Sequence, residues 1–317
     1  MFEDFANVWT PLGLARDVVS TRMTSFQVAN ERVVVFRDPS GDLAALVDKC
    51  PHRGVALSLG KIKDGLISCP FHGWQFDSLG RNCLVPWNSD AKREALGATA
   101  LPVREVAGLI WLYTGFNPET SPLPGEALAR KDVSLTAQSM VWNVHWTRVM
   151  ENMLDTPHLP FVHRRSIGRG LIKELSHDME MIWEPRAYGA DIRSQFNGRP
   201  RGAGLTYRYP NVMELIIDPP GKTFRLLAVC TPQTLSTTCL TIYTIRNFAK
   251  FSWLDPVFRR LNRRIALEDK AIVESSQPSE VPRPAEECSV RTDRPTLAFR
   301  KIYFDQIKGS RSIRPAP

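Results

Sequence analysis

Two short loops, each with a cysteine followed closely by a histidine, hold the residues of this chain best suited to chemistry. Cys50 and His52 form Cys-x-His, and sixteen residues later Cys69 and His72 form Cys-x-x-His. Two thiolates and two imidazoles in mixed pairs are the ligands of a [2Fe–2S] cluster in which the cysteines hold one iron and the histidines hold the other. The spacing therefore predicts a redox centre.

The two loops, residues 50–54 and 69–74, also have the backbone features that such a centre requires. A proline follows each cysteine and stiffens the turn, and a glycine one or two residues after each histidine lets backbone amides approach the cluster sulfurs. The alternative is a structural zinc site. Zinc fingers keep the Cys pair and the His pair apart, whereas each half of this pattern contains one of each. The pattern favours a Rieske [2Fe–2S] cluster.

A second set of candidate ligands lies further along the chain. His158 and His163 are separated by four residues, and Asp155 precedes the first histidine by three. On a continuous helix the two histidines would point about 140° apart, but Pro160 lies between them and is expected to break the helix. The second histidine then turns back toward the same metal. Two histidines and one carboxylate with open positions are the facial triad of non-haem Fe(II) oxygenases.

The elements that must position these ligands suggest an α+β fold of two domains. Residues 1–120 have the short strands and tight turns of a small all-β domain. After a Pro-rich stretch, residues 125–307 suggest a catalytic domain with an antiparallel sheet covered by helices, one containing Glu151 to His158 and another running from Leu254 to Gln277. Residues 308–317 are basic and polar and are expected to form a frayed tail.

Composition narrows the possible partners and the compartment. The net charge of +8, from 41 basic and 33 acidic residues, suits an acidic partner, and no RNP, KH or zinc-finger signature indicates nucleic acid. We find no apolar run of membrane-spanning length and no signal peptide, so we expect no membrane partner and a cytoplasmic location. Six cysteines in 317 residues do not indicate a disulfide scaffold.

The combination of the two metal motifs resembles the Rieske non-haem iron oxygenases, specifically their catalytic α subunits. The resemblance begins at Asn7–Leu12 and continues through both motifs to Leu267–Glu274 and Asp293–Pro295. The spacing of Asp155, His158 and His163 fits the family pattern. The length and the late Glu-Asp pair are most similar to the compact homo-oligomeric branch, which contains monooxygenases and demethylases.

This resemblance implies that an Asp on the late helix is the third iron ligand, and Asp269 matches that position. From the residues alone, Ile265, Asp269 and Ile272 share one helix face, and an Asp there is costly unless it is paired or bound to metal. Glu268, about 100° away on the helix, remains the alternative ligand.

The resemblance further implies two cofactors, a Rieske [2Fe–2S] cluster and a mononuclear Fe(II). Electrons would come from NAD(P)H through an external flavin reductase, a ferredoxin or both. The implied reaction is O2-dependent hydroxylation of a small organic substrate; the alternatives are oxidative O- or N-demethylation and ring cis-dihydroxylation. A Rieske electron-transfer protein is the non-enzyme alternative, although a carrier has no use for a second iron.

The resemblance also assigns roles beside the metals. In the family the cluster of one subunit works with the iron of the next, which implies a homotrimer. Asp155 matches the carboxylate that bridges the two sites, and Asn152 matches a polar residue close to the iron. The basic residues near the cluster loops, Arg53, Lys61 and Lys63, are candidates for docking an acidic ferredoxin.

Overall fold

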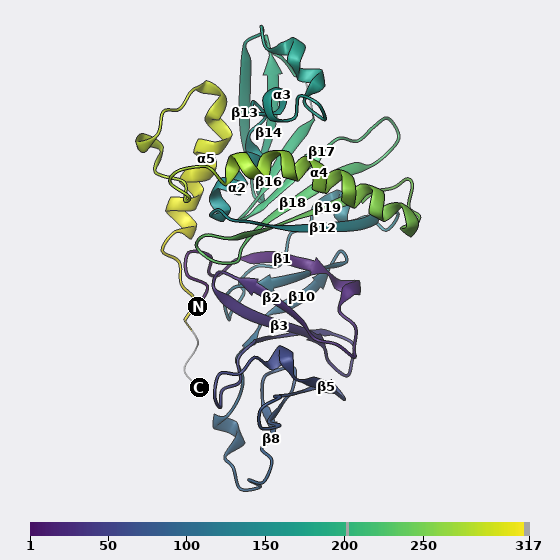
Figure 1. The fold of residues 1–317 in the computed structure, drawn as a ribbon, viewed down its shortest axis with the longest axis vertical. Helices are drawn as coiled ribbons and strands as arrows, with labels where there is room; N and C mark the ends of the chain where they lie inside the picture. The colour runs from purple at the N-terminus through teal and green to yellow at the C-terminus, as the bar shows by residue number, and fades with distance from the viewer. Residues whose placement is uncertain (201–202, 314–317) are drawn as a thin grey trace. The chain divides into compact units, whose positions relative to one another are not determined.

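The computed structural model of the protein describes residues 1–200 and 203–313, and these residues form two compact units (Figure 1). The first unit comprises Met1–Pro122 and the segment that begins at Gly309, and the second comprises Leu123–Lys308. Strands and short 3-10 turns make up the described part of the first unit, whereas the second contains a large antiparallel sheet and helices. The predicted α+β fold, an all-β domain followed by a sheet with helices, is confirmed.

The first unit has three small antiparallel sheets in its described part. Their strand orders are β1-β11-β10, β2-β3-β4-β9 and β5-β6-β7-β8. The strands are β1 (Trp9–Leu14), β2 (Thr24–Val28), β3 (Glu31–Arg37), β4 (Leu43–Val47), β5 (Lys61–Lys63), β6 (Leu66–Ser68), β7 (Gln75–Phe76), β8 (Asn82–Leu84), β9 (Ala100–Leu101), β10 (Val103–Val106) and β11 (Leu109–Tyr113). Cys50 and Cys69 belong to the same buried cluster as Phe36, Leu46 and Phe76, so the hydrophobic core itself anchors both metal loops.

The second unit is built on one antiparallel sheet, which has eight strands in the part of the chain that the structure describes. The strand order is β12-β19-β18-β17-β16-β14-β13, and β15 pairs with β14. The strands are β12 (Ser134–Trp142), β13 (Met179–Arg186), β14 (Gly189–Phe196), β15 (Arg199–Pro200), β16 (Gly204–Arg208), β17 (Val212–Ile216), β18 (Phe224–Pro232) and β19 (Thr238–Arg246). This sheet is the platform on which the helices that carry the second set of candidate ligands are held.

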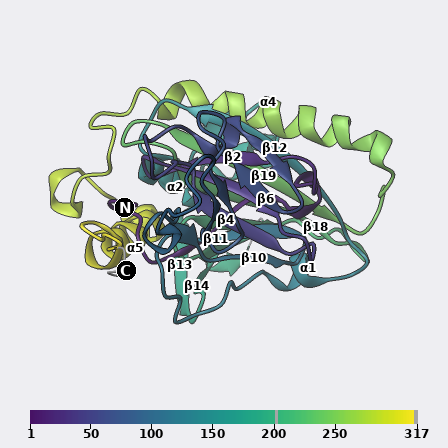
Figure 2. The ribbon, with the colours of Figure 1, turned by 90° about the horizontal axis from the view of Figure 1, so that it is seen from below.

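The helices of the second unit are α1 (Glu126–Ala129), α2 (Trp146–Leu154), α3 (Leu159–Val162), α4 (Asp255–Val273) and α5 (Arg294–Ile302). Helix α4 packs along β12, α2 packs against β17, β18 and β19, and α5 packs against β13 (Figures 1 and 2). Buried polar contacts fix α4 on the sheet. Asp255 accepts hydrogen bonds from Thr136 at 2.7 Å and from Arg246 at 2.5 Å, and Asn262 donates to Thr244 at 2.8 Å. The position of any ligand on α4 is therefore set by the sheet.

Helix boundaries differ from the sequence expectation at three places. The helix expected to contain Glu151 to His158 ends at Leu154, because Pro157 disfavours helical backbone before it. Pro160 does not break a helix; it lies in the first turn of α3, where its missing N–H is not needed. The late helix ends at Val273 rather than Gln277, where the chain turns and the Glu274 carboxylate accepts a hydrogen bond from the Asn143 amide.

The C-terminal segment also differs from the expected frayed tail. In residues 309–313, Ser312 exchanges backbone hydrogen bonds with Met1, and Ser310 accepts hydrogen bonds from the amides of Asp4 and Ala6. This segment therefore belongs to the first unit. The rest of the predicted tail, residues 314–317, lies outside the described residues. Within the described ranges, the helices lack the combined length and apolar character needed to cross a membrane.

Candidate functional site

The two cluster loops have the same local backbone architecture. In each, the cysteine amide donates to the carbonyl five residues later, from Cys50 to Val55 at 2.8 Å and from Cys69 to Trp74 at 2.8 Å. In each, the glycine four residues after the cysteine donates back to the cysteine carbonyl and has a positive φ, +72° at Gly54 and +71° at Gly73. Glycine adopts this left-handed backbone at little cost, which explains its place in both loops. Two equivalent turns thus present one cysteine and one histidine each.

The ligand side chains of these loops divide between the interior and the surface. Cys50 and Cys69 are buried, whereas the rings of His52 and His72 lie nearer the surface, 4.7 Å apart between centroids. Trp74 stacks on His52 with the ring planes 3° apart, which fixes that imidazole. The four predicted cluster ligands are therefore held on adjoining turns, with the cysteine pair on the inner side.

The pKa values of two predicted cluster ligands are shifted: the Cys50 thiol holds its proton more tightly than usual, and the His52 imidazole holds its proton less tightly. Burial, together with the neighbouring thiol of Cys69, raises the pKa of Cys50 to about 11. Desolvation lowers the pKa of His52, and the charges of His72 and Arg53 lower it further. Without metal Cys50 keeps its proton, so cluster assembly must release it. The donor set of two buried sulfurs and two outward imidazoles fits a Rieske [2Fe–2S] cluster.

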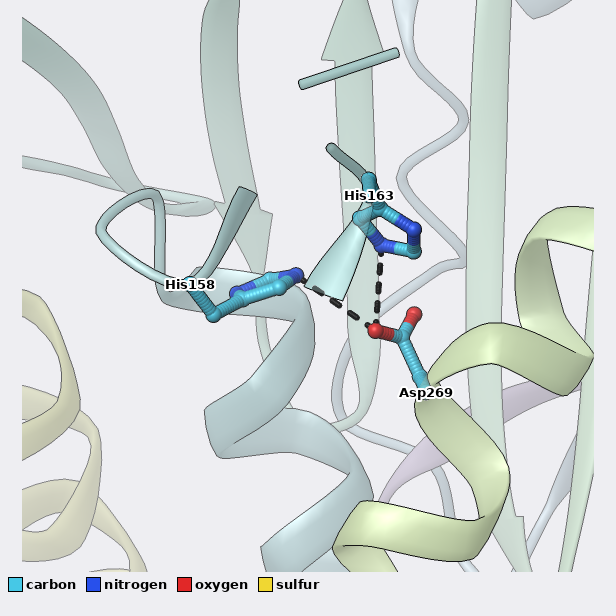
Figure 3. A group of neighbouring side chains, drawn as sticks. All are labelled: His158, His163 and Asp269. Carbon is cyan, nitrogen blue, oxygen red and sulfur yellow. Dashed lines mark ion pairs between the residues drawn. The ribbon is translucent and has the colours of Figure 1, made fainter. Parts of the chain in front are cut away.

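The second candidate site joins three side chains from two separate stretches of the second unit. His158 and His163 flank α3, and Asp269 comes from α4; their side chains converge in Figure 3. Asp269 Oδ1 lies 3.0 Å from His163 Nε2 and 3.6 Å from His158 Nε2. All three ligand atoms lie within 4.8 Å of one another. A metal ion with bonds of about 2 Å fits between atoms at this spacing.

The remaining nitrogen of each histidine faces another carboxylate. His158 Nδ1 lies 3.0 Å from Asp155 Oδ2, which also accepts the His158 amide, and His163 Nδ1 lies 2.7 Å from Glu268 Oε2. Hydrogen bonds at Nδ1 leave the two Nε2 atoms free to bind a metal. Glu268, which the sequence left as the alternative ligand, thus contacts Nδ1 of His163, the nitrogen that points away from the triad. Asp269 faces the Nε2 atoms of both histidines.

Burial supports the assignment of these three atoms to a metal. The Asp269 carboxylate is almost completely enclosed, and within the described residues its Oδ1 faces the two Nε2 atoms without a well-formed hydrogen bond. An enclosed carboxylate oxygen that faces two imidazole nitrogens is costly to keep charged, and a divalent cation bound among these three atoms would remove that cost. Two imidazoles and one carboxylate are the ligand set of the facial triad, so the residues present fit a mononuclear Fe(II).

The two other candidate residues lie on α2 or at its end. Asp155 follows the helix with an extended backbone and is partly exposed. Asn152 has a buried side-chain nitrogen with no hydrogen-bond partner in the described part of the chain. Its neighbour Glu151 points elsewhere, into salt bridges with Arg148 and Arg300.

Gly168 is a residue of this site that the sequence analysis missed. Its amide donates to the His163 carbonyl at 3.0 Å, and a Cβ built on Gly168 would lie 1.8 Å from the Leu159 carbonyl oxygen. Only glycine fits this closed turn, which fixes the backbone of His163. The sequence does show a glycine five residues after His163, but without the fold Gly168 could not be distinguished from any other glycine in a loop.

We therefore expect Gly168→Ala to lower the affinity of the second site for Fe(II) about tenfold or more, because the turn must open and His163 must move. Gly170→Ala is the matched control, since a Cβ at Gly170 meets no atom within 4 Å. Fe(II) titration of both variants, with the cluster intact, gives the comparison. Equal affinities would show that the turn does not position His163.

Comparison with known proteins gives two family matches. Residues 8–96 match the Rieske [2Fe-2S] domain, and residues 203–308 match the vanillate O-demethylase oxygenase C-terminal domain. The first match contains all four cluster-loop ligands. The second contains Asp269 but begins after both histidines of the second site.

Relatives and solved structures agree with these matches. Chlorophyllide a oxygenase of Chlamydomonas reinhardtii is 33% identical over 53% of this chain and 26% of its own length. The oxygenase subunit of 3-chlorobenzoate-3,4-dioxygenase from Comamonas testosteroni is 29% identical over 56% of this chain and 40% of its own. The chain thus spans less than half the length of these relatives. The structure of NdmA from Pseudomonas putida CBB5 has the same fold, with a TM-score of 0.79, 23% identity, and coverage of 94% of this chain and 89% of that one.

Proposed function

This chain belongs to the Rieske oxygenases, and we propose that it is a terminal oxygenase component that hydroxylates a small organic substrate with O2. The observation that carries the proposal is the convergence of His158 Nε2, His163 Nε2 and Asp269 Oδ1 in a chain that also has the cluster loops. A carrier of electrons needs only the cluster, whereas a second open iron site gives those electrons a use.

The chain's own residues bind, orient and shield in this proposal. When bound, the iron supplies the oxygen-activating chemistry and the cluster supplies electrons to it. Asp155 and Glu268 hold the Nδ1 protons and keep both Nε2 atoms directed inward. Burial of His163 and Asp269 keeps water from that side of the site. Asn152, whose buried amide nitrogen has no partner in the described part of the chain, is proposed as a polar residue near the iron that can donate a hydrogen bond.

Hydroxylation by one oxygen atom is the favoured reaction, and oxidative O- or N-demethylation is the same attack on a methyl carbon bound to oxygen or nitrogen. The match of residues 203–308 to an O-demethylase oxygenase domain supports this choice. The likeness to a dioxygenase subunit keeps ring cis-dihydroxylation as the second candidate.

The electrons are proposed to come from NAD(P)H through a flavin reductase, a ferredoxin or both. A hollow of about 440 Å³ beside His52 and His72 is lined by Trp74, Pro86 and Trp87, and the Trp87 side chain is 95% exposed. The basic residues Arg53, Lys61 and Lys63 are exposed nearby in the sequence. An outward aromatic residue and basic groups suit an acidic protein partner.

We further propose a homotrimer in which the cluster of one subunit serves the iron of the next. The position of His52 and His72 near the surface, and the partial exposure of Asp155, support a contact of this kind between subunits. A reducing compartment, the cytoplasm, is proposed as the location, since none of the six cysteines is in a disulfide.

Asp155→Asn is expected to retain both metals and to lower turnover by about a hundredfold. The amide preserves the shape of the side chain but loses the charge that orients His158 and, in the proposed trimer, the cluster histidine of the neighbouring subunit. Iron content and single-turnover reduction of the variant would be compared with those of the unmodified protein. Unchanged turnover would exclude the bridging role.

The function is tested by measuring iron and acid-labile sulfide per chain together with substrate-dependent O2 consumption under a chemical reductant. Three irons to two sulfides, with O2 uptake that rises when a substrate is added, is the expected result. Two irons to two sulfides would make the protein an electron carrier. Zinc without sulfide would exclude the redox function altogether.

A further inference from the structure

The ring nitrogen of His163 that points away from the triad, Nδ1, faces the carboxylate of Glu268, which precedes Asp269 on α4. We propose that Glu268 is a positioning residue for His163, held in place by Ser166, and that it is not an iron ligand. The inference rests on the proposed function only in taking the triad as a metal site.

One carboxylate oxygen of Glu268 accepts hydrogen bonds from both His163 and Ser166. Its Oε2 accepts from His163 Nδ1 at 2.7 Å and from the Ser166 hydroxyl at 2.7 Å. The His163 side chain is 2% exposed and that of Glu268 is 24% exposed, so the hydrogen bond is largely shielded from water. Buried hydrogen bonds to a charged acceptor are stronger than those between neutral groups. The carboxylate thus fixes both the ring orientation and the tautomer of His163.

Two consecutive residues of α4 hold opposite sides of one imidazole. Asp269 Oδ1 lies 3.0 Å from His163 Nε2, and Glu268 Oε2 lies at Nδ1. Consecutive helix residues diverge by about 100°, which lets two carboxylates from one helix straddle a ring. Since Glu268 Oε2 is engaged at the nitrogen that points away from the triad, a role for it as the third ligand would require that hydrogen bond to break.

The two histidines are therefore supported in different ways. Asp155 lies three residues before His158 and binds both its amide and its ring, so this support is local. Glu268 is distant in sequence from His163 and joins α4 to the segment after α3. Ser166 strengthens this link, because its amide also donates to the His163 carbonyl at 2.9 Å. The Nδ1 atom of His163 is thus held by α4, while that of His158 is held by a residue of its own segment.

The test compares Glu268→Ala, Glu268→Gln and Ser166→Ala in the full chain. The measured quantities are Fe(II) affinity of the mononuclear site and the electron paramagnetic resonance spectrum of its nitric oxide complex, with the cluster oxidised. We expect Glu268→Ala to weaken Fe(II) binding about 10–100-fold and to change the rhombicity of the spectrum. Glu268→Gln retains an acceptor oxygen and is expected to recover part of the affinity. Ser166→Ala is expected to have the smallest effect.

Arg264→Gln is the control for a change of charge at this position, because Arg264 lies 4.0 Å from Glu268 and its side chain is 71% exposed. Affinity and spectrum unchanged in Glu268→Ala would overturn the proposal. Complete loss of the second iron in both Glu268→Ala and Glu268→Gln would overturn it as well, since Glu268 would then be a ligand. Neither readout needs a substrate, so a failure of the proposed hydroxylation would leave this result interpretable.

Discussion

Asp269→Ala is expected to remove the second iron and leave the cluster untouched, so that three irons and two sulfides per chain become two and two. Asp269 supplies the carboxylate oxygen that faces both Nε2 atoms. Two imidazoles without this anion bind Fe(II) weakly, and O2-dependent turnover should be lost with the metal. Iron and sulfide analysis, with the resonance spectrum of the reduced cluster, provides the measurement.

The fold is expected to tolerate Asp269→Ala, so loss of iron can be distinguished from loss of structure. The enclosed Asp269 carboxylate lies in an ion pair with His163 Nε2 at 3.0 Å, so in the metal-free protein its removal loses that contact and relieves a desolvation cost that offsets it. Thermal unfolding of the metal-free variant should therefore occur at the same temperature or higher. Asp305→Ala, at an exposed carboxylate paired with Lys301, is the control and should keep all three irons. Full retention of the second iron in Asp269→Ala would indicate that Glu268, rather than Asp269, is the third ligand.

The cluster loops could be predicted from the sequence because their chemistry is local. Each turn contains its cysteine, its histidine and the glycine that closes it within five residues, so the spacing alone specifies the site. The same holds for Asp155 and His158, which lie three residues apart. The α+β fold followed from strand and helix patterns that the structure confirms.

What could not be predicted depends on contacts between distant segments. Glu268 and Asp269 are adjacent and chemically similar, and helix periodicity gave only a preference between them; their different contacts with His163 require the position of α4. The packing of residues 309–313 against Met1–Ala6 had no sequence signal, since a basic and polar segment is ordinarily a free tail. Pro160 was predicted to break a helix but lies in the first turn of α3, because a proline is tolerated at a helix start and the sequence did not show where α3 begins.

The second large effect is expected from Arg300→Met, which should destabilise the second unit by about 3–5 kcal/mol. Arg148, Glu151, Glu287 and Arg300 form a salt-bridge ring that joins α2 to α5. Arg300 lies 2.5 Å from Glu151 and 2.6 Å from Glu287, and Arg148 lies 3.1 Å and 2.6 Å from the same two. The side chains of Arg148, Glu151 and Arg300 are nearly buried. Thermal unfolding followed by circular dichroism provides the measurement.

The reason for the size of this effect is the charge that Arg300→Met would leave behind. Burial raises the pKa of Glu151 even though Arg300 and Arg148 both oppose it, so the ionised carboxylate is already costly in the complete ring. Without Arg300 that cost is no longer offset.

Two further variants show whether the destabilisation comes from losing an ion pair or from leaving a buried charge unpaired. One changes an exposed ion pair, and the other removes both charges of the buried pair. Arg130 makes two hydrogen bonds to Asp132, at 2.9 Å and 2.7 Å, but about half of each side chain is exposed. Arg130→Met should therefore have a much smaller effect on the unfolding temperature than Arg300→Met. Glu151→Leu combined with Arg300→Met removes both charges, leaves Arg148 paired with Glu287, and should recover much of the stability. If the double variant were as unstable as Arg300→Met alone, packing of the arginine stem rather than the unpaired carboxylate would explain the loss.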